Sequence, residues 1–273
     1  GVEVFGATGD VDAYRWADVI ITHLDYTQYS IIMAISAKKP IVHFVHNDIP
    51  YSSIQSSMAR TFIAYNSNWI AKKLAYNKPY VVLPPPCDVA YYDTGEQERD
   101  CITLISLNKN KGAEMFYSIA ASLPEKKFIG VVGSYDDQII LNMPNVEIVR
   151  NSPDILATYK RTRILLMPSA YESWGRTATE AMCSGIPVIC TPTPGLKENC
   201  GEAGIFVGKE LESYNPGEPQ VDRGDVEDWV KAIKKLDDPE TYKKYSLLCK
   251  ARAMALDPLA DLENFEKFLY STQ

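Results

Sequence analysis

Residues 163–192 of the chain read RILLMPSAYESWGRTATEAMCSGIPVICTP, and they carry the strongest indication of its fold class. It begins with a continuous apolar run, Ile164 to Met167, typical of a strand buried on both faces of a parallel sheet. A turn with Glu172 and Gly175 follows, then an amphipathic helix containing Glu180, and then a second apolar strand. The stretch therefore predicts a strand–helix–strand unit of a doubly wound α/β fold, in which ligands bind at the carboxyl ends of the strands.

The same alternation of short apolar runs and longer amphipathic segments extends along nearly the whole chain. In the first part we expect strands at 2–5, 18–22, 40–45, 61–65 and 80–83, with helices at 26–37, 52–59 and 67–76. In the second part we expect strands at 101–107, 127–132, 146–149, 163–167, 187–190 and 204–207, with helices at 112–122, 153–160, 177–184, 226–236 and 239–255. The pattern predicts two Rossmann-like, doubly wound parallel-sheet domains.

Prolines, a glycine and acidic residues interrupt this alternation at 84–100, which is typical of an interdomain linker. We therefore expect an N-terminal domain over residues 1–97 and a C-terminal domain over 98–257. A last helix, within the segment 258–273, is expected to cross back to the first domain. The Pro- and Gly-rich stretch 214–219 is interpreted as a surface loop.

Composition excludes several classes of protein. Of the 273 residues, 46% are hydrophobic and 23% charged, as in ordinary globular proteins. A formal net charge of -7 and an isoelectric point near 5.1 argue against binding to nucleic acid or to anionic membranes. No run reaches the roughly 18 apolar residues that a membrane span needs. The six cysteines lack C-x-x-C spacing and several lie in apolar runs, which favours reduced thiols and a cytoplasmic protein.

The helix start after the Ile164 strand is the strongest candidate for a binding site. Free backbone N–H groups are expected there from Trp174, Gly175, Arg176 and Thr177. These donors and the positive end of the helix dipole suit a phosphate group. Eight positions separate Glu172 from Glu180, which puts them up to roughly 12 Å apart. That is too far for the carboxyl pair of a glycosidase. The spacing suits a nucleotide sugar laid across the helix start, with one carboxylate on hydroxyl groups at each end.

Several motifs are shared with one family of enzymes. They are Glu172 and Glu180 with seven residues between them, Ser-Gly-Ile-Pro-Val at 184–188, Gly-Leu-Lys-Glu at 195–198, and Gly-Glu-Ala-Gly at 201–204. In these motifs residues 101–260 closely resemble the retaining GT-B glycosyltransferases of family four, the glycosyl transferases group 1. Residues 17–88 resemble the N-terminal domain of that family more weakly. The resemblance implies a GT-B fold, with a cleft between two Rossmann-like domains and a smaller N-terminal domain.

The resemblance also implies a hexosyltransferase-like activity. A sugar would pass from a nucleoside diphosphate sugar to an acceptor hydroxyl of a glycan, lipid or small molecule, with retention of anomeric configuration and without a metal ion or other cofactor. By the same resemblance, Glu172 would contact the donor sugar and Glu180 the ribose. Lys111 matches the lysine that neutralises the departing diphosphate, and His46 matches a histidine close to the transferred sugar.

Two departures from the family pattern leave alternatives open. The family places an arginine five residues before the lysine, where this chain has Ser106, so that Lys109 or Arg176 would have to compensate. The chain also begins beyond the family's first strand and Gly-rich loop, so the N-terminal domain is expected to be reduced or incomplete. A non-catalytic sugar-nucleotide-binding pseudoenzyme and a nucleotide-sugar epimerase are therefore alternatives. An oxidoreductase using the Gly-Ala-Thr-Gly turn at 6–9 is a third, although that turn lacks a third glycine.

Overall fold

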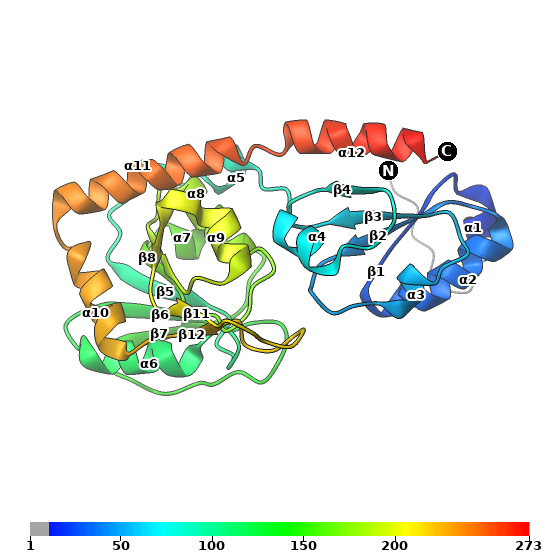
Figure 1. Cartoon of the computed structure of the whole chain (residues 1–273). Helices are drawn as coiled ribbons and strands as arrows, with labels where there is room; N and C mark the ends of the chain where they lie inside the picture. The colour runs from blue at the N-terminus through cyan, green and yellow to red at the C-terminus, as the bar shows by residue number, and fades with distance from the viewer. Residues whose placement is uncertain (1–10, 273) are drawn as a thin grey trace. The chain divides into compact units, whose positions relative to one another are not determined.

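The computed structural model describes residues 11–272, which divide into two compact units. Unit 1 comprises the described residues up to Pro84 together with those from Leu259 onward, and unit 2 comprises Pro85–Pro258. Each unit contains a parallel sheet of its own (Figure 1). The strand expected at 2–5 and the turn at 6–9 lie outside the described residues.

Unit 1 is built on a four-stranded parallel sheet in the order β1-β2-β3-β4. Its strands are β1 (Ile20–His23), β2 (Ile41–Val45), β3 (Thr61–Tyr65) and β4 (Tyr80–Val82). Its helices are α1 (Val11–Trp16), the short η1 (Leu24–Tyr26), α2 (Thr27–Ala37), α3 (Ser52–Gln55), α4 (Asn68–Leu74) and α12 (Leu259–Ser271).

Both faces of this sheet are covered by helices, because successive strand residues point to opposite sides. On one face, apolar side chains of β1, β2 and β3 pack against α2, α3 and α4. On the other face, the ring of Phe44 lies 5.4 Å from that of Phe265, and Phe62 lies 5.7 Å from Phe268. The last helix, α12, therefore completes the core of unit 1 although it follows unit 2 in the sequence.

Unit 2 contains a six-stranded sheet and a short hairpin. The sheet strands are β5 (Cys101–Ile105), β6 (Lys127–Val131), β7 (Val146–Val149), β8 (Thr162–Met167), β9 (Val188–Cys190) and β10 (Gly204–Phe206). The hairpin strands are β11 (Lys209–Glu210) and β12 (Val221–Asp222). The helices are α5 (Val89–Tyr92), α6 (Ala113–Ser122), α7 (Leu156–Tyr159), α8 (Arg176–Cys183), α9 (Pro194–Cys200), η2 (Gly201–Ala203), α10 (Val226–Lys235) and α11 (Pro239–Ala255).

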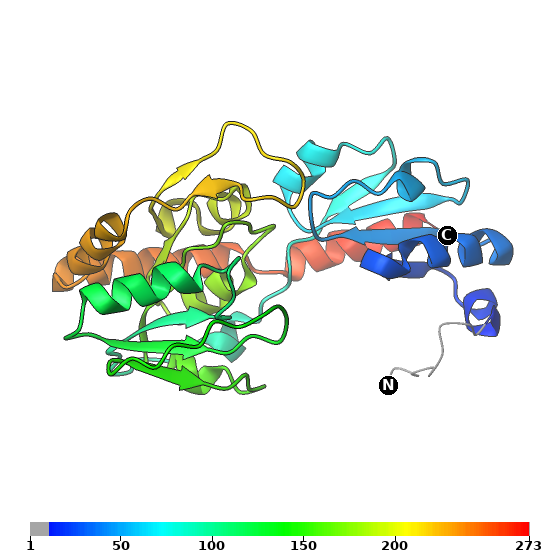
Figure 2. The same ribbon diagram turned by 90° about the horizontal axis from the view of Figure 1, so that it is seen from below.

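The sheet of unit 2 has the order β10-β9-β8-β5-β6-β7 with all pairs parallel, which confirms the doubly wound α/β prediction. Leu165 and Met167 pack with α8 and α11 on one face, whereas Ile164 and Leu166 pack with α6 and α10 on the other. Helices α6 and α10 lie side by side in both views of the molecule (Figures 1 and 2). The apolar run read from the sequence is thus buried on both faces.

Residues 84–100, interpreted from the sequence as a linker, contain a helix that packs on unit 2. Asp88 caps α5 by accepting a hydrogen bond from the backbone N–H of Tyr91. Ser184, directly after α8, donates to the carbonyl of Tyr92 at 2.6 Å and accepts from the backbone N–H of Thr94 at 2.9 Å. Residues 85–97 therefore belong to unit 2, whereas the sequence had placed them in the first domain.

The strand order places a ligand site at one point of the unit 2 sheet. From β5 the chain builds outward through β6 and β7, and then returns to the other side of β5 to build β8, β9 and β10. The topological switch point therefore lies between β5 and β8, where open α/β sheets bind ligands outside the strand ends. The loops that leave these two strands carry Lys111 and Glu172. Among the helices of residues 11–272, none combines the length and apolar character needed to cross a membrane.

Candidate functional site

The side chains of Lys111 and Glu172 form an ion pair across the switch point. The Nζ atom of Lys111 lies 2.6 Å from Oε1 of Glu172, with 18% and 8% of the two side chains exposed. The hydroxyl of Ser169 donates to the same carboxylate oxygen at 2.8 Å. Burial acts to lower the pKa of Lys111, but Glu172 and Tyr135 together outweigh it, so the pKa is raised. Lys111 is therefore a charged ammonium group at neutral pH.

Close backbone packing brings the two loops together. Gly112 precedes α6 with φ +84, and a Cβ atom added there would lie 2.3 Å from the carbonyl oxygen of Pro168. The backbone N–H of Ala170 donates to the carbonyl of Asn110 at 2.8 Å. Only glycine permits this approach, because any other residue would carry its Cβ into the Pro168 backbone. The loop after β5 is thus fixed against the loop after β8.

The start of α8 offers unpaired backbone donors. Gly175 precedes the helix with φ +86, a conformation that glycine adopts at no steric cost. Within residues 11–272, no acceptor is found for the backbone N–H groups of Trp174, Gly175, Arg176 and Thr177. These are the residues for which the sequence predicted free donors, and together with the helix dipole they suit an anion.

Helix α9 fixes the turn that leads into α8. Asn199 is fully buried, and its Nδ2 donates to the carbonyls of Trp174 at 3.1 Å and Gly175 at 2.9 Å. A Cβ atom added to Gly195 would lie 2.4 Å from the carbonyl oxygen of Glu172. The hydrogen bonds from Asn199 and the close packing of Gly195 thus hold the turn against α9. The side chain of Trp174 is 4% exposed and packs inside the unit.

Glu180 has partners of its own and is 7% exposed. The hydroxyl of Tyr159 donates to Oε2 at 2.8 Å, and Nε of Arg176 lies 2.9 Å from Oε1. Burial, followed by the charge of Glu180, raises the pKa of Tyr159 well above its usual value, so the phenol stays protonated as a donor. Glu172 and Glu180 thus form ion pairs with different cations, Lys111 and Arg176.

Ser106 forms a hydrogen bond within the loop that follows β5. Ser106 has φ +72 and is 6% exposed, and its hydroxyl accepts from the amide of Asn108 at 3.1 Å. Asn108 in turn accepts the backbone N–H of Lys111 at 2.8 Å. Asn108 therefore links the hydroxyl of Ser106 to the backbone N–H of Lys111, and Lys109 is exposed on a neighbouring cavity.

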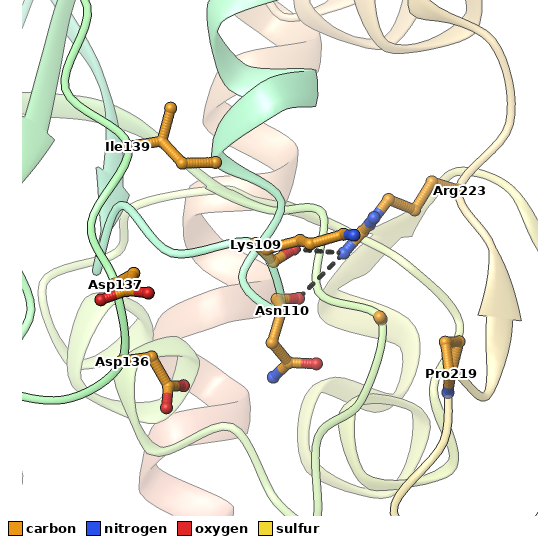
Figure 3. Close-up of a pocket in the computed structure, with 8 residues that line it drawn as sticks. Lys109, Asn110, Asp136, Asp137, Ile139, Pro219 and Arg223 are labelled. Atoms are coloured by element: carbon orange, nitrogen blue, oxygen red, sulfur yellow. Dashed lines mark hydrogen bonds between the residues drawn. The ribbon is translucent and has the colours of Figure 1, made fainter.

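This cavity has a volume of about 570 Å³, within the range of small-molecule sites. It is lined by Lys109, Asn110, Asp136, Asp137, Ile139, Ala170, Pro219 and Arg223. In Figure 3, the two aspartates lie on one side and Arg223 with Pro219 on the other. Its lining includes residues of the loops after β5, β6 and β8. The first and the last of these loops also carry Lys111 and Glu172. Arg223 lies outside every motif recognised in the sequence.

His46 belongs to unit 1, where it follows β2. Its ring lies edge-on to that of His23 at 5.6 Å and stacks on Phe44 at 6.0 Å. Burial, and then the charge of His23, lowers the pKa of His46, so the imidazole is neutral at neutral pH. Within the described residues, no group of three or more His, Cys, Asp or Glu is arranged to hold a metal ion.

The two parallel-sheet units define the GT-B class of fold. The family model of the glycosyl transferases group 1 matches residues 98–237, about half of the chain. The chain therefore belongs to this family.

Curated relatives match over shorter segments. A sulfoquinovosyl transferase of Arabidopsis thaliana is 31% identical over 149 residues, which are 52% of this chain and 27% of that protein. A D-inositol 3-phosphate glycosyltransferase of Pseudarthrobacter chlorophenolicus is 30% identical over 108 residues, 38% of this chain and 21% of that protein. The match to these two relatives thus spans about a quarter of their length or less.

Solved structures share the fold at low sequence identity. The Anabaena protein HepE in complex with UDP-glucose superposes with a TM-score of 0.76 at 16% identity, covering 96% of this chain and 80% of that one. A glycosyltransferase from Rickettsia africae superposes with a TM-score of 0.73 at 16% identity, covering 99% of this chain and 84% of that one. These likenesses establish the shared GT-B architecture.

Proposed function

We propose that this protein transfers a sugar from a nucleoside diphosphate sugar to an acceptor hydroxyl, with retention of anomeric configuration and without a metal ion. The observation that carries the proposal is the Lys111–Glu172 ion pair at the switch point, beside the free N–H groups at the start of α8. A buried ammonium group and a helix N-terminus supply positive charge for a diphosphate. The UDP-glucose complex of the similarly folded HepE supports a nucleoside diphosphate sugar as the donor class.

Each charged group has a role in this reaction. As the bond between the anomeric carbon and the diphosphate oxygen breaks, Lys111 and the α8 backbone stabilise the negative charge on the leaving group. The carboxylate of Glu172 accepts hydrogen bonds from the donor sugar, and that of Glu180 from the ribose. The neutral imidazole of His46 orients the transferred sugar. The acceptor oxygen bonds to the anomeric carbon on the face that the diphosphate leaves, and the proton of the acceptor hydroxyl passes to the departing diphosphate oxygen.

A thermal-shift screen with nucleoside diphosphates and their sugars tests donor binding, because a ligand bound only by the folded state raises the melting temperature. Product analysis by NMR then tests retention, and a chelator added to the assay tests metal independence. We expect one base to stabilise the protein, an axial or equatorial linkage that matches the donor, and the same rate with the chelator. An inverted linkage would refute the retaining mechanism, and a rate abolished by the chelator would refute metal independence.

A non-catalytic sugar-nucleotide binder is the second candidate, because Ser106 stands where the family has an arginine and is bonded to Asn108. The two candidates differ in turnover. Donor binding with neither transfer nor slow donor hydrolysis would favour the binder, whereas release of nucleoside diphosphate by either route favours the transferase.

A further inference from the structure

The hairpin β11–β12 contacts the loop that carries Glu172. At the base of the hairpin, a Cβ atom added to Gly208 would lie 2.2 Å from the carbonyl oxygen of Asp222, so the two strands are closely apposed. The backbone N–H of Gln220 donates to the carbonyl of Ala170 at 2.8 Å. The hairpin is thus attached two residues before Glu172.

Arg223, directly after the hairpin, joins the loops that leave β5 and β8. Its Nε donates to the carbonyl of Pro168 at 2.6 Å. Its Nη2 donates to the carbonyls of Lys109 at 2.8 Å and Asn110 at 3.0 Å, drawn as dashed lines in Figure 3. Burial lowers the pKa of Arg223, but a guanidinium group remains charged in proteins. One rigid planar group therefore adds three hydrogen bonds between the two loops to their backbone packing.

Gln220 is the second contact, and its side chain is fully buried. Its Oε1 accepts a long hydrogen bond of 3.4 Å from the backbone N–H of Glu172. Its Nε2 has no hydrogen-bond partner within residues 11–272. A buried donor without an acceptor destabilises a fold, and an apolar side chain of similar size would avoid this cost. An apolar side chain would, however, leave the backbone N–H of Glu172 without this acceptor, so the amide at this position serves the backbone of Glu172.

We propose that Arg223 and Gln220 are positioning residues for the Lys111–Glu172 pair. Arg223 holds the two loops at the separation that lets the pair form, and Gln220 orients the backbone of Glu172. The kinetic part of this inference rests on the proposed function. Neither residue needs to touch the donor, because both act through the backbone of the loops.

Substitution of Gln220 separates positioning from stability. In Gln220→Met the unpaired amide is gone while the volume is nearly kept. We expect the urea midpoint to change little, because removal of the unpaired amide donor is offset by loss of the acceptor for the Glu172 N–H. We expect turnover to fall at least fivefold and affinity for the nucleoside diphosphate to stay within twofold. Turnover equal to that of the wild type, or a loss that follows a lowered midpoint, would overturn the role of Gln220.

Substitution of Arg223 is tested with chemical rescue. We expect Arg223→Ala to lower turnover at least tenfold and millimolar guanidinium ion to restore part of it. The control is Arg163→Ala, because Arg163 also donates to a carbonyl, that of Leu236 at 3.1 Å, and covers the ring of Tyr242. We expect neither loss nor rescue in the control. A loss in Arg223→Ala without rescue would overturn the positioning role.

A measurement without substrate distinguishes this inference from the proposed function. The coupling between Lys111 and Glu172 is obtained from the urea midpoints of Lys111→Met, Glu172→Gln and the double variant. We expect the coupling to fall by at least half in an Arg223→Ala background and to stay unchanged in an Arg163→Ala background. Equal coupling in both backgrounds would overturn the inference even in an active enzyme. If the coupling falls as expected in the Arg223→Ala background but the protein transfers no sugar, only the proposed function is refuted.

Discussion

Lys111 and Glu172 stand 61 positions apart in the sequence, yet their side chains meet at 2.6 Å. The contact is made by the two loops on either side of the switch point of the unit 2 sheet. Each charge compensates the other in a place with little water, so that removal of one leaves the other poorly compensated. In the donor complex that we propose, the ammonium group would face a diphosphate and the carboxylate a sugar.

Replacement of Lys111 by Ala is expected to lower turnover roughly 100- to 1,000-fold, since loss of one strong contact to a developing charge costs about 2.7 to 4 kcal/mol in the barrier. Initial rates at saturating donor measure the effect. Lys127→Ala is the control, because Lys127 forms an exposed ion pair with Asp100 and should leave the rate unchanged. A loss below tenfold in Lys111→Ala would remove Lys111 from the mechanism.

Replacement of Glu172 by Ala is expected to lower turnover while affinity for the free nucleoside diphosphate stays within about threefold, since Glu172 is assigned to the sugar. The change is measured by comparing steady-state rates with calorimetric titration of the diphosphate. If the affinity for the diphosphate fell as much as turnover, the sugar assignment would be wrong.

Replacement of Glu180 by Ala is expected to weaken nucleoside diphosphate binding by about 10- to 100-fold, the range for lost hydrogen bonds to a charged group. Calorimetry measures the affinity directly. Tyr159→Phe removes only the hydroxyl that donates to Glu180 and should have a smaller effect. Unchanged affinity in Glu180→Ala would contradict the ribose assignment.

The buried side chain of His43 is expected to make the free energy of unfolding depend on pH. It is 1% exposed, its Nδ1 lies 3.2 Å from the Thr27 hydroxyl, and burial, then His46 and His23, lowers its pKa from 6.5 to about 4. The unfolded chain takes up the proton at higher pH than the folded one. This contribution to stability is therefore complete above pH 6.5 and is lost as pH falls toward 4.

Between pH 7 and pH 5, His43 alone is expected to reduce the free energy of unfolding by about 2 kcal/mol. Urea unfolding at the two values measures the fall. In His43→Gln, which keeps a polar partner for Thr27, the fall should be smaller by that amount. The same fall in both proteins would show that His43 does not titrate in this way.

Several strands were well predicted because they are short, largely apolar runs. The prediction at 61–65 coincides with β3, and those at 146–149 and 163–167 agree with β7 and β8 to within one residue. Helix α11 also has the predicted bounds, 239–255. Runs of this kind carry their own signal, since no partner segment is needed to recognise them.

Elements defined by caps or by tertiary contacts were missed. The signal for α9 was present, because Thr193 accepts the backbone N–H of Leu196 and Pro194 occupies the first turn. The two-residue strands β11 and β12 are too short for any periodicity. The contacts of Arg223 depend on how the chain folds back, which local sequence does not specify.

Among the candidate site residues, the sequence indicated the loops but not the partners. It selected Lys111 and Glu172 separately, whereas their ion pair follows from strand order. It selected Glu180 without Tyr159, which comes from a different helix. Sequence motifs thus located the candidate site residues, but they did not show which side chains bind each other.

The late place of α12 in the sequence affects how unit 1 can be made. Until the ribosome has added residues 259–271, Phe44 and Phe62 lack the rings of Phe265 and Phe268 that cover them. One apolar face of the nascent first sheet therefore stays exposed while unit 2 is synthesised. We expect chaperones to bind the chain during this time.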